Sequence, residues 1–207
     1  MLKIYGRANS INVRKVLWAL EELGLPFTRE DWGRGYRPLT DPDFERVNPF
    51  MVVPVMDDGG FVLRESNSIV RYLCSKQGRA DLYPVELEAR ATVESWMDWA
   101  STDLYRGVQP VFHGLVTKIP GSEDPAKIAA GVKDWSAQMG RLDAWLSVHG
   151  PYICGPAFTI ADIPAGLVVN RWFTIPMERP AFTHVAAYYD RLGQRRPYQV
   201  HGRNGTP

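Results

Sequence analysis

The spacing of apolar residues predicts that the first part of the chain alternates between strands and helices. Residues 2–5 have the pattern of a strand, and apolar residues from Val13 to Leu23 recur at the i, i+3, i+4, i+7 positions of an amphipathic helix that begins near Val13. Gly24 and Pro26 predict the end of that helix. The remaining elements are strands at residues 27–31, 55–56 and 61–63, and helices at 42–47 and from residue 66. The predicted order is therefore βαβαββα.

After Gly78 the pattern becomes almost entirely helical. Residues 81–84 have the character of a linker, and apolar stripes predict helical segments across residues 93–104 and 128–146. Pro197 is expected to end the last helix. An α/β domain followed by an all-α domain is therefore expected, with bounds at residues 1–79 and 85–207.

Composition excludes several classes of function. Of the 207 residues, 45% are hydrophobic and 23% are charged, which is typical of a globular protein. The net charge of +1 gives no field that would attract nucleic acid or an acidic membrane surface. No stretch approaches the roughly 20 apolar residues of a membrane-spanning helix, and the N-terminal residues lack the profile of a signal peptide. We therefore expect a cytoplasmic location and neither nucleic acid nor membrane as a partner.

The two cysteines, Cys74 and Cys154, lie far apart and form no Cys-x-x-Cys pattern. This spacing supports neither a dithiol redox centre nor a zinc site, so no metal cofactor is expected. The use of cysteine fits a reducing compartment.

Two local patterns indicate a ligand. Pro54 interrupts an apolar run, and because proline has no N–H for a sheet ladder it marks a strand start or a tight turn, where the preceding bond can be cis. Glu65 and Ser66 precede a helical pattern, and the free N–H groups of a helix start bind anions. Each pattern alone also fits a simple strand start or a helix N-cap. Together they predict a docking surface for a small, peptide-like ligand with a carboxylate. Thr159 and Asp162, in contrast, have the spacing of a capping box, and a purely structural role is expected for them.

The whole chain resembles the glutathione S-transferases of the cytosolic type, particularly their serine-type, theta-like classes. Four segments carry the resemblance, in the family's order and spacing: Ser10–Val16, Val53-Pro54, Glu65–Leu73 and Thr159–Asp162. The resemblance implies a thioredoxin-like domain that binds glutathione, followed by a helical domain that holds the electrophile.

The resemblance also implies that Ser10, helped by Asn12, activates the thiol of glutathione. A free thiol has a pKa of about 8.5, and the thiolate is the nucleophile. A hydroxyl or amide that donates to sulfur stabilises the thiolate, as does the N-terminal dipole of a helix. Simple N-capping is the other interpretation of both residues. Tyr5, at the end of the first strand, is the alternative donor, although it can also be a packed strand residue.

The resemblance implies that the other contacts with glutathione are made by Arg37, Val53, Pro54, Glu65 and Ser66. The backbone of Val53 would pair with the peptide-like middle of glutathione if the Val53-Pro54 bond is cis. Ser66 suits the γ-glutamyl carboxylate, and Glu65 suits the ammonium group beside it. Arg37 is the candidate for the glycyl carboxylate, and a solvated loop cation is its other interpretation.

The resemblance implies that the electrophile pocket is lined by Tyr105, Phe112, His113 and Trp172. These side chains can equally belong to the core of the helical domain. The expected activity is conjugation of the co-substrate glutathione to small hydrophobic electrophiles, a detoxification reaction, by a homodimer that buries the aromatic-rich segment 93–104. Two alternatives remain open, a glutathione-dependent disulfide reductase and a non-enzymatic carrier of hydrophobic ligands. The absence of cysteine near Ser10 argues only against a mechanism that uses a protein thiol.

Overall fold

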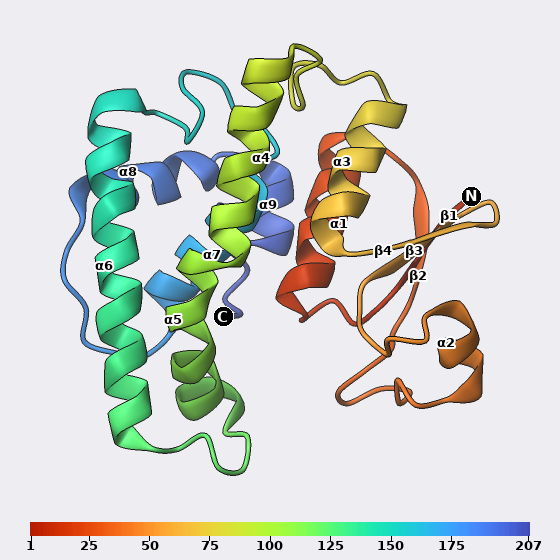
Figure 1. The fold of residues 1–207 in the computed structure, drawn as a ribbon, viewed down its shortest axis with the longest axis horizontal. Coiled ribbons are helices and arrows are strands. Elements are labelled where there is room, and N and C mark those ends of the chain that lie inside the picture. Colours follow the sequence, from red (N-terminus) through yellow and green to blue (C-terminus); the bar gives the residue numbers. More distant parts are fainter. The chain divides into compact units, whose positions relative to one another are not determined.

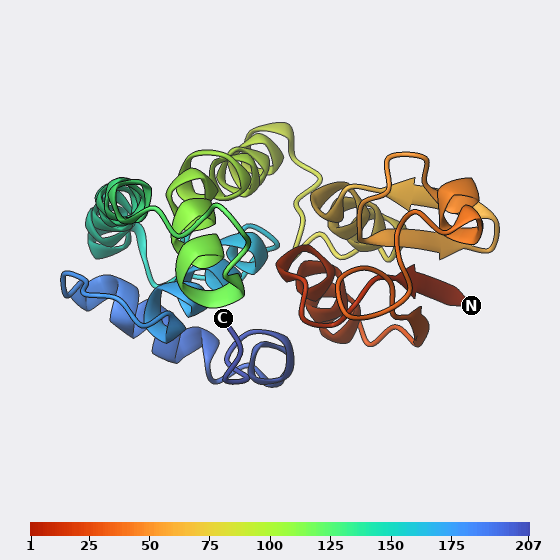
Figure 2. The ribbon, with the colours of Figure 1, turned by 90° about the horizontal axis from the view of Figure 1, so that it is seen from below.

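The computed structural model describes residues 1–207, which form two compact units, Met1–Tyr83 and Pro84–Pro207. All the strands lie in the first unit, and the second unit is helical (Figures 1 and 2). This confirms the predicted fold class of an α/β part followed by an all-α part.

The first unit has the predicted order βαβαββα. Its elements are β1 (Leu2–Tyr5), α1 (Ile11–Glu22), β2 (Phe27–Glu30), α2 (Pro42–Val47), β3 (Val55–Asp58), β4 (Phe61–Arg64) and α3 (Ser66–Lys76). Helix α1 begins at Ile11 rather than near Val13, because Ser10 is the last residue with extended backbone angles (φ −81°, ψ 125°).

The strands form one sheet in the order β2-β1-β3-β4. Strand β1 is parallel to β2 and antiparallel to β3, and β3 is antiparallel to β4. In this register Tyr5 lies opposite Val55, and Val55 lies opposite Arg64. The end of β1, the start of β3 and the end of β4 therefore lie side by side at one end of the strands. We call this end, marked by Tyr5, Val55 and Arg64, the sheet edge.

The two faces of the sheet pack against different helices (Figure 1). Ile4 and Met56 form a core with the apolar residues of α1 and α3. Tyr5 and Val55 point to the other face, where they pack with Trp32 and Phe44. Because successive side chains of a strand point to opposite faces, the alternation from Ile4 to Tyr5 determines which core each residue joins.

The second unit contains six α-helices and one π-helical turn. They are α4 (Leu87–Ser101), α5 (Asp103–Phe112), η1 (His113–Thr117), α6 (Pro125–His149), α7 (Asp162–Thr174), α8 (Thr183–Leu192) and α9 (Arg196–His201). The apolar stripe across residues 93–104 spans two helices, because Thr102 between α4 and α5 has non-helical angles (φ −112°, ψ −84°).

The prediction that Pro197 ends the last helix is wrong. Pro197 lies in the first turn of α9. Proline is favoured there, because the N–H group that it lacks has no acceptor within the helix.

Only one of the two reciprocal hydrogen bonds of the predicted capping box at the start of α7 is formed. The carboxylate of Asp162 accepts a hydrogen bond from the backbone N–H of Thr159 (2.9 Å). The same carboxylate also accepts from the N–H of Ile153 (3.0 Å) and from the hydroxyl of Tyr188 on α8 (2.9 Å). Asp162 therefore joins the preceding loop, α7 and α8 through one fully buried group.

Candidate functional site

Three segments that carry predicted site residues converge at the sheet edge where Tyr5, Val55 and Arg64 are neighbours. Ser10 lies in the loop that follows β1, Val53 lies in the loop before β3, and Glu65 directly follows β4. Helices α1 and α3 both begin at this edge, so it presents two helix N-termini.

Gly6 allows two of these segments to approach closely. Its φ of +142° is a conformation that residues with a side chain rarely adopt. A Cβ atom at this position would lie 2.6 Å from Cγ2 of Val13 and 3.0 Å from Cβ of Val53. Glycine therefore lets the loop before α1 pack directly against the loop that contains Val53.

Ser10 occupies the N-cap position of α1, but its side chain makes no capping hydrogen bond. Its backbone N–H donates to the carbonyl of Arg7 (3.1 Å), and its own carbonyl accepts from the N–H of Arg14 (2.9 Å). The backbone is therefore fixed while the hydroxyl is not used by the helix. This arrangement leaves the Ser10 hydroxyl available to a ligand at the start of α1.

Asn12 is exposed and lies within the first turn of α1. The N-cap position belongs to Ser10, so Asn12 does not cap the helix. Its amide lies one residue into the helix from Ile11, at the same end of α1 as the Ser10 hydroxyl.

Tyr5, the alternative donor, is only 8% exposed and packs with Trp32, Phe44 and Val55. The ammonium of Lys3 lies 4.7 Å from the centre of its ring. This position is on the face of the sheet that packs against α2, opposite the face covered by α1.

The Val53-Pro54 peptide bond is cis, as predicted. Val53 is partly buried and packs against both cores of the first unit, and Pro54 is buried. The structure contains a second cis bond, Gly150-Pro151, in the helical unit.

Glu65 and Ser66 form the junction between β4 and α3. Glu65 has φ +69° and ψ 110°, a strained conformation for a residue with a side chain. Such strain is concentrated at functional sites and costs about 1–3 kcal/mol. Ser66, the first residue of α3, is buried, whereas the carboxylate of Glu65 is exposed and lies 3.2 Å from Nη1 of Arg64. The junction thus combines a carboxylate, a hydroxyl and a helix N-terminus.

Arg37 already forms ion pairs with two carboxylates. Its Nη2 lies 3.1 Å from Asp41 and 3.2 Å from Asp43, and its guanidinium stacks 3.9 Å from the ring centre of Trp32. The side chain is half exposed. These contacts fit the interpretation of Arg37 as a loop cation at least as well as a glutathione contact.

Arg7 was missed by the sequence analysis. It lies in the loop between β1 and α1, forms no ion pair, and is near enough to Arg34 that burial and the Arg34 charge both lower the pKa of its guanidinium. Only the concentration of arginine and glycine in residues 32–39 hinted at this cluster. Two arginines without carboxylate partners suit an anionic group of a ligand better than Arg37 does.

In the helical unit, three of the four predicted pocket residues lie on α5 and at the start of η1: Tyr105 in the first turn of α5, Phe112 at its end and His113 in η1. Tyr105 and Phe112 both contact Arg171 of α7. The ring of His113 lies 5.9 Å from that of Phe112, and its Nδ1 is 3.1 Å from the hydroxyl of Thr117. π-Helical turns such as η1 occur frequently at functional sites.

Trp172, the fourth predicted pocket residue, is not brought together with these three. It is 1% exposed and packs edge-on against Trp135 of α6, with ring centres 5.1 Å apart. The ring centre of Phe182 lies 5.9 Å from that of Trp172. This is the core position that the sequence left open as an alternative.

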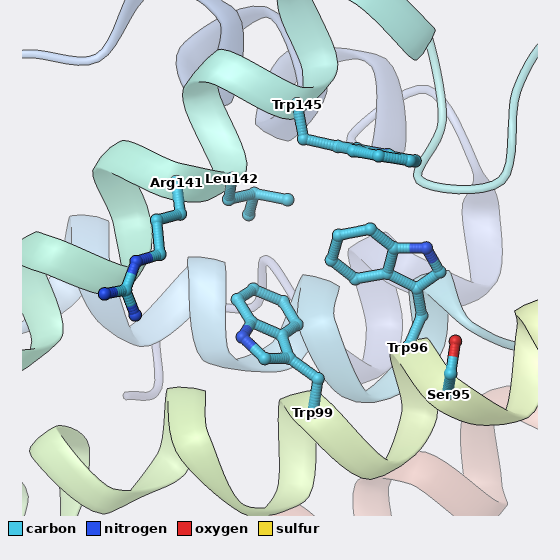
Figure 3. A pocket seen from close by; sticks show the side chains of 6 residues that line it. All are labelled: Ser95, Trp96, Trp99, Arg141, Leu142 and Trp145. Atoms are coloured by element: carbon cyan, nitrogen blue, oxygen red, sulfur yellow. The ribbon is translucent and has the colours of Figure 1, made fainter.

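A further hollow of about 340 Å³ lies between α4 and α6. The rings of Trp96, Trp99 and Trp145 converge on it, whereas the guanidinium of Arg141 points away from the three rings (Figure 3). Leu142 and Ser95 complete the lining.

No group of three or more His, Cys, Asp or Glu side chains is arranged to hold a metal ion. No helix is both long and apolar enough to span a membrane.

Comparison with known proteins identifies relatives of both units. Residues 9–76 match the family model of the glutathione S-transferase N-terminal domain. The glutathione S-transferase GstB of Escherichia coli K12 is 34% identical over 197 residues, which cover 94% of this chain and 94% of GstB. The theta-1 glutathione S-transferase of Rattus norvegicus is 33% identical over 126 residues, which cover 59% of this chain and 52% of that protein.

Among solved structures, a theta-class glutathione S-transferase from Xanthomonas axonopodis pv. citri, crystallised with glutathione bound, is similar over most of its length. Its TM-score is 0.90 at 40% identity, and the match covers 97% of this chain and 96% of that one. The thioredoxin-like first unit and the helical second unit are therefore shared with a glutathione-bound structure.

Proposed function

Because the chain belongs to the glutathione S-transferase family, we propose that it transfers the glutathione thiolate to small hydrophobic electrophiles in a detoxification reaction. Glutathione is the co-substrate. In this reaction the sulfur attacks the electrophilic carbon, a C–S bond forms, and the leaving group departs with its electron pair while the thiol proton passes to solvent. Tyr105, Phe112 and His113 are proposed to contact the electrophile. The observation that carries the proposal is the convergence of Ser10, Val53 and the Glu65-Ser66 junction at one sheet edge.

The groups at this edge would each contact a different part of glutathione. The Ser10 hydroxyl, the Asn12 amide and the dipole of α1 would stabilise the thiolate. The backbone beside Pro54 at Val53 would pair with the peptide-like middle of glutathione. Ser66 and the start of α3 would hold the γ-glutamyl carboxylate, and Glu65 its ammonium. Arg7, with Arg37 as the alternative, would hold the glycyl carboxylate.

Ser10→Ala should raise the pKa of the bound thiol and reduce turnover about ten- to a hundredfold, because a hydrogen bond to a charged group is worth about 1.5–3 kcal/mol. The ultraviolet absorbance of the thiolate, followed against pH with glutathione bound, reads this pKa directly. Asn12→Ala should have a smaller effect, and the exposed Ser75→Ala on α3 serves as a control without effect. If neither Ser10→Ala nor Asn12→Ala moves the titration while Tyr5→Phe does, Tyr5 is the donor.

Disulfide reduction by a protein thiol is not favoured. Burial raises the pKa of Cys74 to about 12 and that of Cys154 to about 11, so neither thiol forms an appreciable thiolate at neutral pH. Both cysteines are free, which fits the proposed cytoplasmic location.

A homodimer is proposed to cover the hollow between α4 and α6. The three tryptophans that line it offer apolar surface to a second copy of the chain, and the same two helices carry the exposed apolar residues Leu87 on α4 and Val148 on α6. Trp96→Glu should therefore shift the mass measured by light scattering at micromolar concentration from twice 23.4 kDa toward 23.4 kDa. Val200→Glu, at an exposed apolar position of α9, should leave the dimer intact. A monomeric wild-type chain would contradict the proposal.

A further inference from the structure

Arg171 is a buried cation without an acidic partner. It lies on α7 and is 2% exposed. The one hydrogen bond of its side chain runs from Nη1 to the hydroxyl of Tyr105 (3.3 Å), and its buried Nε has no partner. Burial lowers the pKa of the guanidinium, and no carboxylate acts in the opposite direction.

Several other arginines of the helical unit have acceptors for their side chains. Arg179 donates from Nε and Nη2 to the carbonyl groups of Met177 (3.3 Å) and Ile175 (2.7 Å) near the end of α7. Arg106 pairs with Asp103 on the surface. Buried charges are normally paired, because removing an ion from water has a large unfavourable free energy. An unpaired buried donor in a native protein therefore indicates a ligand, an ion or a water molecule that completes it.

The surroundings of Arg171 orient its guanidinium. Its central carbon lies 3.7 Å from the ring centre of Phe112 and 5.9 Å from that of Tyr105. Stacking on an aromatic ring fixes the plane of the guanidinium. Nε and Nη2 donate no hydrogen bond, and this edge of the planar fork matches the two oxygens of a carboxylate.

We propose that Arg171 and Tyr105 bind the carboxylate of an aromatic electrophile, so that this transferase prefers acidic aromatic electrophiles to neutral ones. The carboxylate completes the guanidinium edge, and the ring that bears it lies beside Phe112. The reaction of such an electrophile rests on the proposed function, whereas its binding does not. The glycyl carboxylate of glutathione has the same chemistry, so the two sources must be separated experimentally.

The binding step is tested without glutathione. The probes are 3,5-dinitrobenzoate and its neutral isostere 3,5-dinitrobenzamide, titrated against the whole chain by calorimetry. We expect the benzoate to bind about ten- to a hundredfold more tightly than the amide, and Arg171→Met to abolish this preference. Arg171→Lys, which keeps the charge and loses the planar fork, should retain part of it. Arg106→Met, which removes an exposed charge from α5, is the matched control and should retain all of it.

The reaction step uses 4-chloro-3,5-dinitrobenzoate and 4-chloro-3,5-dinitrobenzamide. Each conjugation forms a C–S bond and releases chloride, and each rate is divided by the uncatalysed rate with glutathione. The ratio of kcat/KM for acid over amide should fall about ten- to a hundredfold in Arg171→Met, while the affinity for glutathione stays unchanged. If glutathione affinity falls instead, Arg171 binds the glycyl carboxylate and the proposal is wrong.

Equal binding of the benzoate and the amide by the wild-type chain would also overturn the proposal, whatever the variants do. A benzoate preference without any conjugation would support the carboxylate site and contradict the proposed function alone. If Arg171→Met does not fold, Arg171→Lys and Tyr105→Phe carry the test, and an undiminished preference in both variants would overturn the site.

Discussion

Asp162→Ala is expected to lower the free energy of unfolding of the helical unit by about 3–5 kcal/mol. The substitution would leave the N–H groups of Ile153 and Thr159 and the hydroxyl of Tyr188 buried without their acceptor. Each unsatisfied buried donor costs about 1–3 kcal/mol. Urea denaturation followed by tryptophan fluorescence measures the change. Asp190→Ala, which removes an exposed ion pair with Arg203 in the same unit, should cost less than about 1 kcal/mol.

Asp162 should also make the free energy of unfolding of the helical unit depend on pH. Burial raises the pKa of the Asp162 carboxyl to about 6, while hydrogen bonds from Thr159, Ile153 and Tyr188 act in the opposite direction. Between the unfolded pKa of about 3.9 and about 6, the folded carboxyl holds a proton that the unfolded one has released. Its contribution to stability is therefore present below pH about 4 and is lost as the pH rises through about 6. Asp162→Asn cannot titrate and should flatten this part of the stability curve; an unchanged slope would show that another group is responsible.

Replacing both Glu65 and Ser66 by alanine should weaken glutathione binding by about 2–5 kcal/mol, because charge-assisted hydrogen bonds to the γ-glutamyl end would be lost. Calorimetry with glutathione measures the change. Glu86→Ala is the matched control, since Glu86 is also a helix N-cap and accepts hydrogen bonds at the start of α4 in the other unit.

The single variant Glu65→Gly separates backbone strain from charge. Glycine adopts φ +69° without strain, so this variant should unfold at a higher temperature than Glu65→Ala while it binds glutathione equally weakly. Unchanged affinity in the double alanine variant, with the fold intact, would refute the assigned roles of Glu65 and Ser66.

Much of the first unit could be predicted from local patterns. The strands and helices follow apolar periodicity, and Gly24, Pro26 and Pro42 mark helix ends and starts by their backbone restrictions alone. Two details depended on neighbours rather than on pattern. Ser10 is the N-cap with extended angles, so α1 begins at Ile11, which is buried, and not near Val13. Pro197 is compatible with either a helix end or a first turn, and only the structure shows the latter.

The candidate glutathione site was also predicted from sequence, because its residues lie next to local signals: the proline at 54, the helix predicted to begin near Val13 and the helix predicted to begin at 66. The surroundings of the two candidate donors required the sheet, which places Tyr5 among Trp32 and Phe44 on the face away from α1. Arg7 and Arg37 could not be ranked from sequence, since only the structure shows that Asp41 and Asp43 already pair with Arg37.

By itself, the sequence determined the order of elements and the two-part architecture, because periodicity, turn chemistry and helix capping act between residues close in the chain; that the segments of Ser10, Val53 and Glu65 meet at one edge followed from the register of the sheet. Only the tertiary structure decided which side chains share a face or lack a partner. Arg171 and Trp172 are adjacent in an apolar helix, yet one faces Tyr105 and Phe112 while the other packs on Trp135. The reason is physical: burial, pairing and charge compensation depend on residues that are distant in the chain, and their positions are set by how the helices pack.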